Sequence, residues 1–348
     1  MRKKVLHICR MEKFIPPFIQ LVESEFGLSD HRFVLFGDHV RYPVASRNGI
    51  DKVERNPLAK LGSRFRLIIA MHQADKIILH GLFNRSVTRL LWLMPWLLKK
   101  CYWVMWGDDL YRYQSIAAKG KWTFKESVRC RVIRRMGHLV THIPGDVELA
   151  RQWYGATGQF HPCLMYPSNV FRDVDMSPRE DRRINIQVGN SADPGNNHFE
   201  ILDKLAPYKN EEIAIYVPLS YGSSEHAKAV VDYGEKLFGD KFRPILDFLP
   251  YDKYLEFLSD IDIAIFNHRR QQAMGNTINL LGLGKKVYIR DDVTPWSVFQ
   301  SLGIRIFDVN SLNLGRLDAE DASYNRKAIK SAFSEETLVN QLHAIFES

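Results

Sequence analysis

Long apolar runs are missing from this sequence of 348 residues, in which no stretch of 18 apolar residues occurs. A membrane-spanning helix needs about 20 such residues, so none is predicted. The amino-terminal segment MRKKVLHIC has a short apolar run, Val5–Cys9, that contains His7 and is not followed by a small-residue cleavage site. It therefore predicts a first strand rather than a signal peptide.

Cysteine is scarce, and its spacing suggests neither a zinc site nor a disulfide framework. The four cysteines are Cys9, Cys101, Cys130 and Cys163. A reducing cytoplasm is therefore the expected compartment. No G-x-G-x-x-G follows a predicted strand, which disfavours an NAD-dependent oxidoreductase. The sequence also contains no repeat and no low-complexity segment.

Positive charge is abundant but unevenly spread. The net charge is +8, and the segment 85–135 alone carries twelve Lys or Arg against three acidic residues. Such a patch attracts nucleic acid or anionic lipid. Because no nucleic-acid-binding motif accompanies it, a membrane surface is favoured. Two segments suit the membrane interface: the run LLWLMPWLL at 90–98, which is followed by two lysines, and the basic helix predicted at 121–136. The alternative is a core helix of the first domain with a solvated basic face elsewhere.

Strands alternate with helices along the whole chain, which predicts an α/β fold with doubly wound parallel sheets. The first half is predicted to contain strands at 5–9, 31–37, 76–81, 102–107 and 138–145, and CLMYP at 163–167 closes it. The second half has predicted strands at 184–189, 212–220, 243–249, 262–267 and 286–290, and a last helix from about Tyr324 to Phe346.

This alternation predicts two Rossmann-like domains with a cleft between them. The first, at 1–167, is predicted to bind the acceptor. A polar linker follows at 168–182, and the second domain, at 183–348, is predicted to bind the nucleotide sugar. The final helix is predicted either to belong to the second domain or to cross back to the first. The arrangement is typical of the GT-B architecture of nucleotide-sugar glycosyltransferases. Two-domain dehydrogenases and nucleotide-sugar epimerases fit nearly as well.

The stretch 183–205 combines a β-prone run, a small-residue loop and the start of an amphipathic helix. A strand, a loop and a helix N-terminus present unpaired backbone N–H groups, which suits a phosphate. An ordinary βα turn is the alternative. In the later stretch 246–290, Arg269 and Arg270 with backbone amides near 273–277 are expected to stabilise a diphosphate leaving group without a metal ion. A solvated pair of arginines is the alternative here.

Several segments resemble one bacterial family, in the same order and over most of the chain. These segments are HGLFN at 80–84, WVMWGDDLY at 103–111, MYPSN at 165–169, VGNSADPGNNH at 188–198, VPLSYG at 217–222 and RRQQAMGNT at 269–277. They are similar to the TDP-N-acetylfucosamine:lipid II N-acetylfucosaminyltransferases, or 4-alpha-L-fucosyltransferases, of glycosyltransferase family 56. This sequence departs from the family at Asp108, where the family has a small residue, and at Pro194-Gly195, which leaves room for another donor sugar or acceptor.

The resemblance implies a hexosyltransferase that moves a deoxy-amino sugar from a TDP-sugar to a polyprenyl-diphosphate-linked saccharide. It implies enterobacterial common antigen synthesis at the cytoplasmic face of the bacterial inner membrane, with peripheral attachment and with neither a metal ion nor a cofactor. The two glutamates spaced seven apart that are common in GT-B enzymes are absent. The residues expected to contact the donor are Gly189, Asn190, Ser191, Ser220, Tyr221, Gly222, Leu249, Tyr251, Arg269, Arg270, Gln271, Gln272, Gly275, Asn276 and Thr277.

An inverting enzyme of this type needs a carboxylate or histidine in its first domain to take the acceptor proton. Asp109, at the carboxyl end of a predicted strand, is the first candidate, and Asp108 and His80 come next, ahead of Glu12 and His7. A helix N-cap is the alternative for the Asp pair, and a core position is the alternative for His80. If configuration is retained, Asp109 only binds the acceptor. Two rival functions remain, a nucleotide-sugar epimerase and a non-catalytic sugar-binding or membrane-recruitment protein.

Overall fold

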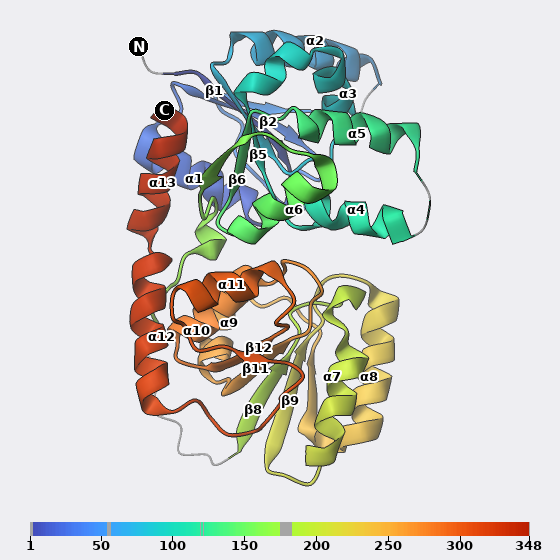
Figure 1. Cartoon of the computed structure of the whole chain (residues 1–348), viewed down its shortest axis with the longest axis vertical. Helices are drawn as coiled ribbons and strands as arrows, with labels where there is room; N and C mark the ends of the chain where they lie inside the picture. Colours follow the sequence, from blue (N-terminus) through green and yellow to red (C-terminus); the bar gives the residue numbers. More distant parts are fainter. Residues whose placement is uncertain (1–2, 54–56, 119, 121, 175–182, 348) are drawn as a thin grey trace. The chain divides into compact units, whose positions relative to one another are not determined.

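The computed structural model describes residues 3–53, 57–118, 120, 122–174 and 183–347 (Figure 1). The chain divides into two compact units, one formed by Met1–Asn169 with Glu335–Ser348 and the other by Val170–Ser334. The predicted linker, 168–182, begins at the boundary between these units, and its residues 175–182 lie outside the described residues. We refer below to the first unit and the second unit.

The first unit is built on a parallel sheet with the strand order β3-β2-β1-β4-β5-β6-β7. Its strands are β1 (Val5–Arg10), β2 (His31–Phe36), β3 (Ile50–Lys52), β4 (Lys76–His80), β5 (Cys101–Val104), β6 (His138–Thr141) and β7 (Gln159–Pro162). The strand order reverses between β1 and β4. In open α/β sheets, ligands bind outside the carboxyl ends of the strands at such a switch point.

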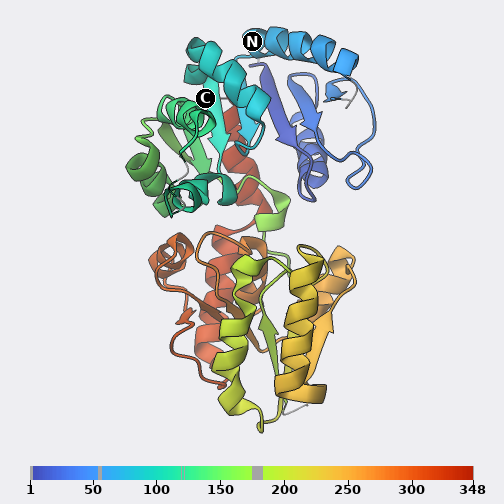
Figure 2. The same ribbon diagram turned by 90° about the vertical axis from the view of Figure 1, so that its right-hand side faces the viewer.

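Helices cover both faces of this sheet (Figures 1 and 2). They are α1 (Ile15–Phe26), α2 (Pro57–Gln73), α3 (Arg85–Leu93), α4 (Asp108–Ala118), α5 (Phe124–Arg134), α6 (Pro144–Tyr154) and α13 (Glu335–Glu347), with 3-10 turns η1 (Pro95–Lys100) and η2 (Pro167–Asn169). Side chains of a strand alternate between faces. Leu6 and Ile8 of β1 accordingly join the core formed with α2, α3, α5 and α6, whereas His7 between them packs on Phe18 of α1 and Phe346 of α13.

The second unit repeats the plan with the parallel strand order β10-β9-β8-β11-β12-β13. Its strands are β8 (Ile184–Val188), β9 (Ile213–Pro218), β10 (Phe242–Ile245), β11 (Ile263–Phe266), β12 (Lys286–Ile289) and β13 (Phe307–Asp308). Its helices are α7 (His198–Leu205), α8 (Ser224–Phe238), α9 (Tyr251–Ser259), α10 (Met274–Gly282), α11 (Thr294–Ser301) and α12 (Ala319–Ala332), with 3-10 turns η3 (Pro194–Asn196), η4 (Ala206–Tyr208) and η5 (Gly239–Lys241). The switch point lies between β8 and β11.

The predicted fold class is confirmed, since both units are parallel sheets with helices of the Rossmann type. The closing segment at 163–167 lies in the first unit, directly after β7, a strand that the sequence did not predict. One local prediction was wrong. The predicted final helix is two helices, because Phe333 leaves the helical conformation: its carbonyl accepts a hydrogen bond from the Phe171 N–H at 2.8 Å, and its ring packs on Phe299.

In the described part of the chain, every helix is too short or too polar to cross a membrane.

Candidate functional site

The loop after β8, residues 189–197, is organised by the buried side chain of Asn196. Its carboxamide oxygen accepts a hydrogen bond from the Asn190 N–H at 2.9 Å and lies 2.8 Å from Nε2 of His268. Its amide nitrogen donates to the carbonyl of Ser191 at 3.1 Å. Because an amide oxygen only accepts, His268 carries its proton on Nε2. Asn196 thus connects the loops that follow β8 and β11, the two strands at the switch point.

Gly189 begins this loop and must be glycine for two reasons. Its φ of 67° is in the left-handed region, which glycine adopts without strain. A Cβ atom at this position would lie 2.7 Å from the Asn196 carboxamide oxygen and 2.8 Å from Nε2 of His198. The tight packing therefore brings the loop backbone close to the buried polar side chains around it.

The loop after β11 leads into α10, whose first turn contains three of the predicted donor contacts, Gly275, Asn276 and Thr277. Ala273 precedes the helix with φ 57° and provides no side-chain cap. The first N–H groups of a helix have no partner within that helix. The amino end of α10 is therefore a site where an anion is stabilised.

The two predicted arginines of this loop differ in their surroundings. Arg270 has a side chain that is 25% exposed and lines a recess together with His268, Gln272 and Thr277. The Arg269 side chain is 71% exposed. Each guanidinium lies 3.9 Å from one carboxylate, that of Glu200 for Arg269 and that of Asp193 for Arg270. Only Arg270 is thus placed where it can interact with a group bound at the start of α10.

Buried polar atoms without a hydrogen-bond partner gather at this edge of the second sheet. Among the described residues, they include His198 Nε2, Asn190 Oδ1, Asn267 Nδ2, Gln271 Oε1 and Gln272 Oε1. Buried polar groups are nearly always paired in folded proteins, and leaving one unpaired costs about 1–3 kcal/mol. A concentration of such atoms at a topological switch point indicates that a polar ligand completes their hydrogen bonding.

The predicted contacts after β9 lie beside the same loop. Tyr221 accepts a hydrogen bond from the Asn190 side chain at 3.0 Å, and Gly222 forms a bridge with Ala192. A Cβ atom at Gly222 would lie 2.6 Å from the Ala192 carbonyl carbon. Ser220, directly before them, is half-buried. The structure therefore brings the loops after β8 and β9 together.

Of two further predicted contacts, Leu249 lies in the connection from β10 to α9, and Tyr251 is the first residue of α9. Leu249 is half-buried, and Tyr251 is exposed with the Arg172 guanidinium 5.4 Å from its ring centre. No described contact connects this pair to the loop after β8. Tyr254, one turn further along α9, does reach the site, where its hydroxyl forms hydrogen bonds with Gln187 and Asn276. Burial and the nearby Tyr221 raise the pKa of Tyr254, although these hydrogen bonds act to lower it.

Asp109, the first candidate for the catalytic base, is almost fully buried in the first unit. Its Oδ2 accepts hydrogen bonds from the Trp103 indole at 2.6 Å and the Leu82 N–H at 3.0 Å, and its Oδ1 accepts from the Trp106 N–H at 2.9 Å. Burial raises the pKa of Asp109 despite these donors and the nearby charge of Arg129. Both oxygens point into the fold, which favours a structural role over the predicted role as base. Asp108, by contrast, is exposed in the first turn of α4.

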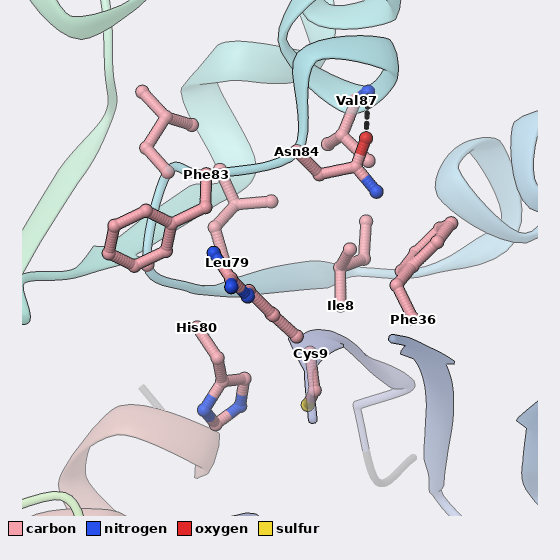
Figure 3. A pocket seen from close by; sticks show the side chains of 11 residues that line it. Ile8, Cys9, Phe36, Leu79, His80, Phe83, Asn84 and Val87 are labelled. Atoms are coloured by element: carbon pink, nitrogen blue, oxygen red, sulfur yellow. Dashed lines mark hydrogen bonds between the residues drawn. The ribbon is translucent and has the colours of Figure 1, made fainter. Parts of the chain in front are cut away.

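His80, the other predicted candidate, belongs to a buried chain of hydrogen bonds. Its Nδ1 lies 2.8 Å from the Tyr166 hydroxyl and its Nε2 lies 3.1 Å from Nδ1 of His7, whose Nε2 lies 3.0 Å from Nδ1 of His31. Figure 3 shows a recess lined by Ile8, Phe36 and Leu79, and the His80 ring points away from these apolar side chains. His80 is 1% exposed, so this geometry favours the alternative that it is a core histidine with its hydrogen bonds satisfied.

Comparison with known proteins agrees with this architecture. A family model described as 4-alpha-L-fucosyltransferase glycosyl transferase group 56 matches residues 59–313. The chain belongs to this family. It is therefore a glycosyltransferase, and the predicted family and enzyme class are confirmed.

Solved structures similar to this group 56 transferase share its fold at low sequence identity. HepE from Anabaena, in complex with UDP and glucose, has a TM-score of 0.68 and 11% identity, with 98% of each chain covered. Sucrose-phosphate synthase from Thermosynechococcus elongatus has a TM-score of 0.68 and 11% identity, covering 99% of this chain and 98% of that one. WaaG, a glycosyltransferase involved in lipopolysaccharide biosynthesis, has a TM-score of 0.57 and 12% identity, covering 98% and 95%. The fold is that of the GT-B glycosyltransferases.

Sequence reasoning missed several polar residues at the carboxyl edge of the second sheet, namely Asn196, His198, Tyr254, Asn267 and His268. Two of them had a usable signal: Asn267 and His268 directly follow the strand IAIF, and polar residues at the carboxyl end of a parallel strand are candidates for ligand contact. The others had none, because their importance depends on contacts between separate loops.

We expect the first unit of this group 56 transferase to lose stability in acid. Burial lowers the pKa of His31 to about 4 and that of His80 to about 3, and burial with its histidine neighbours lowers the pKa of His7 well below 6.5. The unfolded chain therefore binds more protons below about pH 6.5, so the free energy of unfolding falls as the pH drops from there toward 4.

The measurement is urea unfolding of the wild-type protein and two variants between pH 7.5 and pH 5. His31→Gln retains a polar partner for His7 but cannot titrate, so it should reduce the dependence of unfolding free energy on pH by up to about 1.4 kcal/mol per pH unit. His72→Gln, which changes an exposed histidine, serves as the control and should leave the slope unchanged. Equal slopes for all three proteins would contradict the prediction.

Proposed function

We propose that this glycosyltransferase moves a deoxy-amino sugar of the N-acetylfucosamine type from a TDP-sugar to a polyprenyl-diphosphate-linked saccharide. The process would be synthesis of a bacterial surface polysaccharide related to enterobacterial common antigen. Membership of group 56 supports the sugar class. The observation that carries the donor site is the cluster of unpartnered buried polar atoms at the switch point of the second sheet.

The donor diphosphate would be held at the amino end of α10. The Arg270 guanidinium and the N–H groups of the first helical turn would stabilise the negative charge that develops on the leaving group. These groups would stabilise the negative charge of the leaving diphosphate, as a metal ion does in other transferases. We therefore expect transfer without a metal ion or another cofactor. The carboxamides of Gln271, Gln272 and Asn190 would donate to or accept from sugar and ribose hydroxyls. HepE, which has the same fold, binds UDP-glucose.

The acceptor would be presented at the cytoplasmic face of the bacterial inner membrane, to which the protein would attach peripherally. Exposed apolar side chains support this attachment: Phe65 and Ile69 on α2, Leu93 on α3, Trp96 on η1 and Phe124 on α5. These elements lie over one face of the first sheet and contribute to one core, and α2, α3 and η1 contain no acidic residue. Exposed aromatic and basic side chains together suit the surface of an anionic bilayer.

We expect the protein to bind vesicles that contain phosphatidylglycerol, with binding that weakens as salt is raised. Leu93→Glu with Trp96→Glu should weaken binding by about tenfold or more, because it removes apolar insertion and adds negative charge. Val40→Glu, at an exposed position of the loop after β2, is the control for an apolar-to-acidic change elsewhere on the first unit and should have a small effect. Sedimentation with vesicles measures both. Equal loss in the two variants would contradict the placement of this surface.

The function itself is tested by titrating the purified protein with TDP, UDP, GDP and NAD at one ionic strength, followed by a transfer assay with the matching nucleotide sugar. We expect TDP to bind best. A preference for UDP or GDP would keep the reaction class and reject the donor. Release of free nucleotide with an altered sugar and no acceptor would indicate an epimerase. The absence of nucleotide binding with and without a lipid-linked acceptor would reject the proposal.

A further inference from the structure

Three aromatic side chains from separate loops meet at the carboxyl edge of the first sheet. Phe14 follows β1, Phe83 follows β4 and Trp106 follows β5. The ring centres of Phe14 and Trp106 are 4.7 Å apart, and those of Phe83 and Trp106 are 5.2 Å apart. All three side chains are half-buried rather than enclosed in the core. We call them the aromatic platform. It lies at the switch point between β1 and β4, where open α/β sheets bind ligands.

Trp106 is held in place through both of its N–H groups. Its indole N–H donates to the Tyr166 hydroxyl at 2.8 Å, and its backbone N–H donates to Asp109 at 2.9 Å. Tyr166 is itself held by His80 at 2.8 Å. With its polar edge turned inward, the remaining surface of the indole is apolar and rigid, and part of it stays open to solvent. Such a surface binds by contact rather than by hydrogen bonding.

The backbone around the platform is arranged to allow these contacts. Gly81 has φ 72°, and a Cβ atom there would lie 2.4 Å from the Phe83 ring and 3.1 Å from the Trp106 ring. Met165, directly before Tyr166, adopts φ 64° although it is not a glycine. Non-glycine residues in this region are strained by about 1–3 kcal/mol, and such strain concentrates at ligand sites. A glycine that leaves room for both rings and a strained Met165 thus lie next to the platform and to the tyrosine that holds its indole.

Polar groups and a small recess border the platform. The Arg10 guanidinium carbon lies 5.7 Å from the centre of the Phe83 ring. Beside it, a recess of about 10 Å³ opens between the ends of β1 and β4, with Ile8, Phe36 and Leu79 in its wall (Figure 3). This volume is about what one water molecule requires. A pyranose ring has C–H groups on its faces and hydroxyl or acetamido groups at its rim, which matches an aromatic surface bordered by polar groups.

We propose that Phe14, Phe83 and Trp106 form the surface on which a pyranose ring of the acceptor saccharide stacks, with Tyr166 as the positioning residue that holds the indole. This inference rests on the proposed function, because it assigns acceptor binding to the first unit. It differs from the proposed function in its residues: the donor is held by the second unit, and the platform lies wholly in the first.

The direct test is saccharide binding by saturation-transfer NMR with the methyl glycosides of glucose, galactose, N-acetylglucosamine and N-acetylmannosamine at millimolar concentration. The wild-type protein should bind at least one of them, and Trp106→Ala should weaken that binding at least tenfold, which corresponds to about 1.4 kcal/mol. Trp153→Phe, at another half-buried indole of the first unit, should bind like the wild type. Absence of binding in the wild type, or unchanged affinity in Trp106→Ala, would overturn the inference.

The positioning role has its own signature. Tyr166→Phe keeps the ring and removes the hydroxyl that accepts the indole hydrogen bond. We expect the fluorescence of Trp106 to differ between the wild type and Tyr166→Phe. In each of the two proteins, the Trp106 signal is obtained by subtracting the spectrum of the same protein with Trp106→Phe. The saccharide affinity of Tyr166→Phe should be reduced several-fold. TDP affinity should not change. A purely structural role would lower the melting temperature and leave the saccharide affinity of the folded protein intact.

These experiments separate the inference from the proposed function. If the protein binds saccharide through Trp106 but does not bind TDP, the proposed donor is rejected and the aromatic platform stands. If it binds TDP and transfers sugar while Trp106→Ala keeps the wild-type KM for the acceptor, the platform is rejected and the function stands. In a transfer assay, the inference predicts a rise of about tenfold in the acceptor KM of Trp106→Ala with an unchanged KM for the donor.

Discussion

Replacing Arg270 by alanine is expected to lower the turnover of sugar transfer by about 100-fold, the effect typical of losing one preorganised group that stabilises developing charge. Replacing Arg269 by alanine removes the same charge from the neighbouring position and is expected to change turnover by less than about threefold, as for other exposed charges. The pair is a matched test because the two variants have the same net charge and lie in the same loop.

The difference arises from the direction of the two side chains. Arg270 lines the recess at the start of α10, and its guanidinium donates to the Gln271 carbonyl at 3.3 Å, whereas Arg269 extends into solvent. A charge in a partly buried site is screened less by water, so it stabilises a leaving diphosphate more strongly.

The measurement is kcat with the nucleotide sugar that binds best, together with nucleotide affinity by calorimetry. Arg270→Lys should recover part of the activity, since a lysine supplies charge without the planar pair of donors. An Arg270→Ala protein with wild-type turnover and affinity would remove Arg270 from the site. Equal losses in the two alanine variants would show that the loop contributes only through its total charge.

Replacing Asp109 by alanine is expected to lower the free energy of unfolding by about 3–5 kcal/mol, the cost of removing one partner from a buried charged network. The donors of Leu82, Trp103 and Trp106 would lose their acceptor. The buried guanidinium of Arg129, which donates to the Asp109 carbonyl, would also lose a nearby negative charge. Asp108→Ala should change stability by less than about 1 kcal/mol because Asp108 is exposed.

Urea unfolding of the two variants gives these values, and transfer assays at a temperature where both remain folded separate stability from catalysis. If Asp109→Ala is as stable as the wild type and loses only turnover, the predicted role of Asp109 as catalytic base stands and the structural role is wrong. If Asp108→Ala loses turnover without losing stability, the exposed carboxylate is the better candidate for the base.

The alternation of strands and helices, and therefore the two parallel sheets, could be predicted from the sequence because hydrophobic period and turn residues are local properties. The family could be predicted for a similar reason: segments such as WVMWGDDLY and VGNSADPGNNH resemble those of the family and occur in the same order. The break between α12 and α13 could not be predicted, since it depends on a hydrogen bond from Phe171 to a carbonyl that lies far away in the sequence.

The sequence by itself therefore determined the fold class and the family, and it predicted the segments of the candidate site. Tertiary structure alone decided between neighbours within those segments. Asp108 and Asp109, or Arg269 and Arg270, are chemically identical pairs, and their different surroundings come from which side chain the surrounding loops turn inward. A carboxylate becomes structural when donors from β5 and from the loops after β4 and β5 converge on it, and an indole becomes a binding surface when a distant tyrosine accepts the hydrogen bond of its N–H. Those partners come together only in the folded chain.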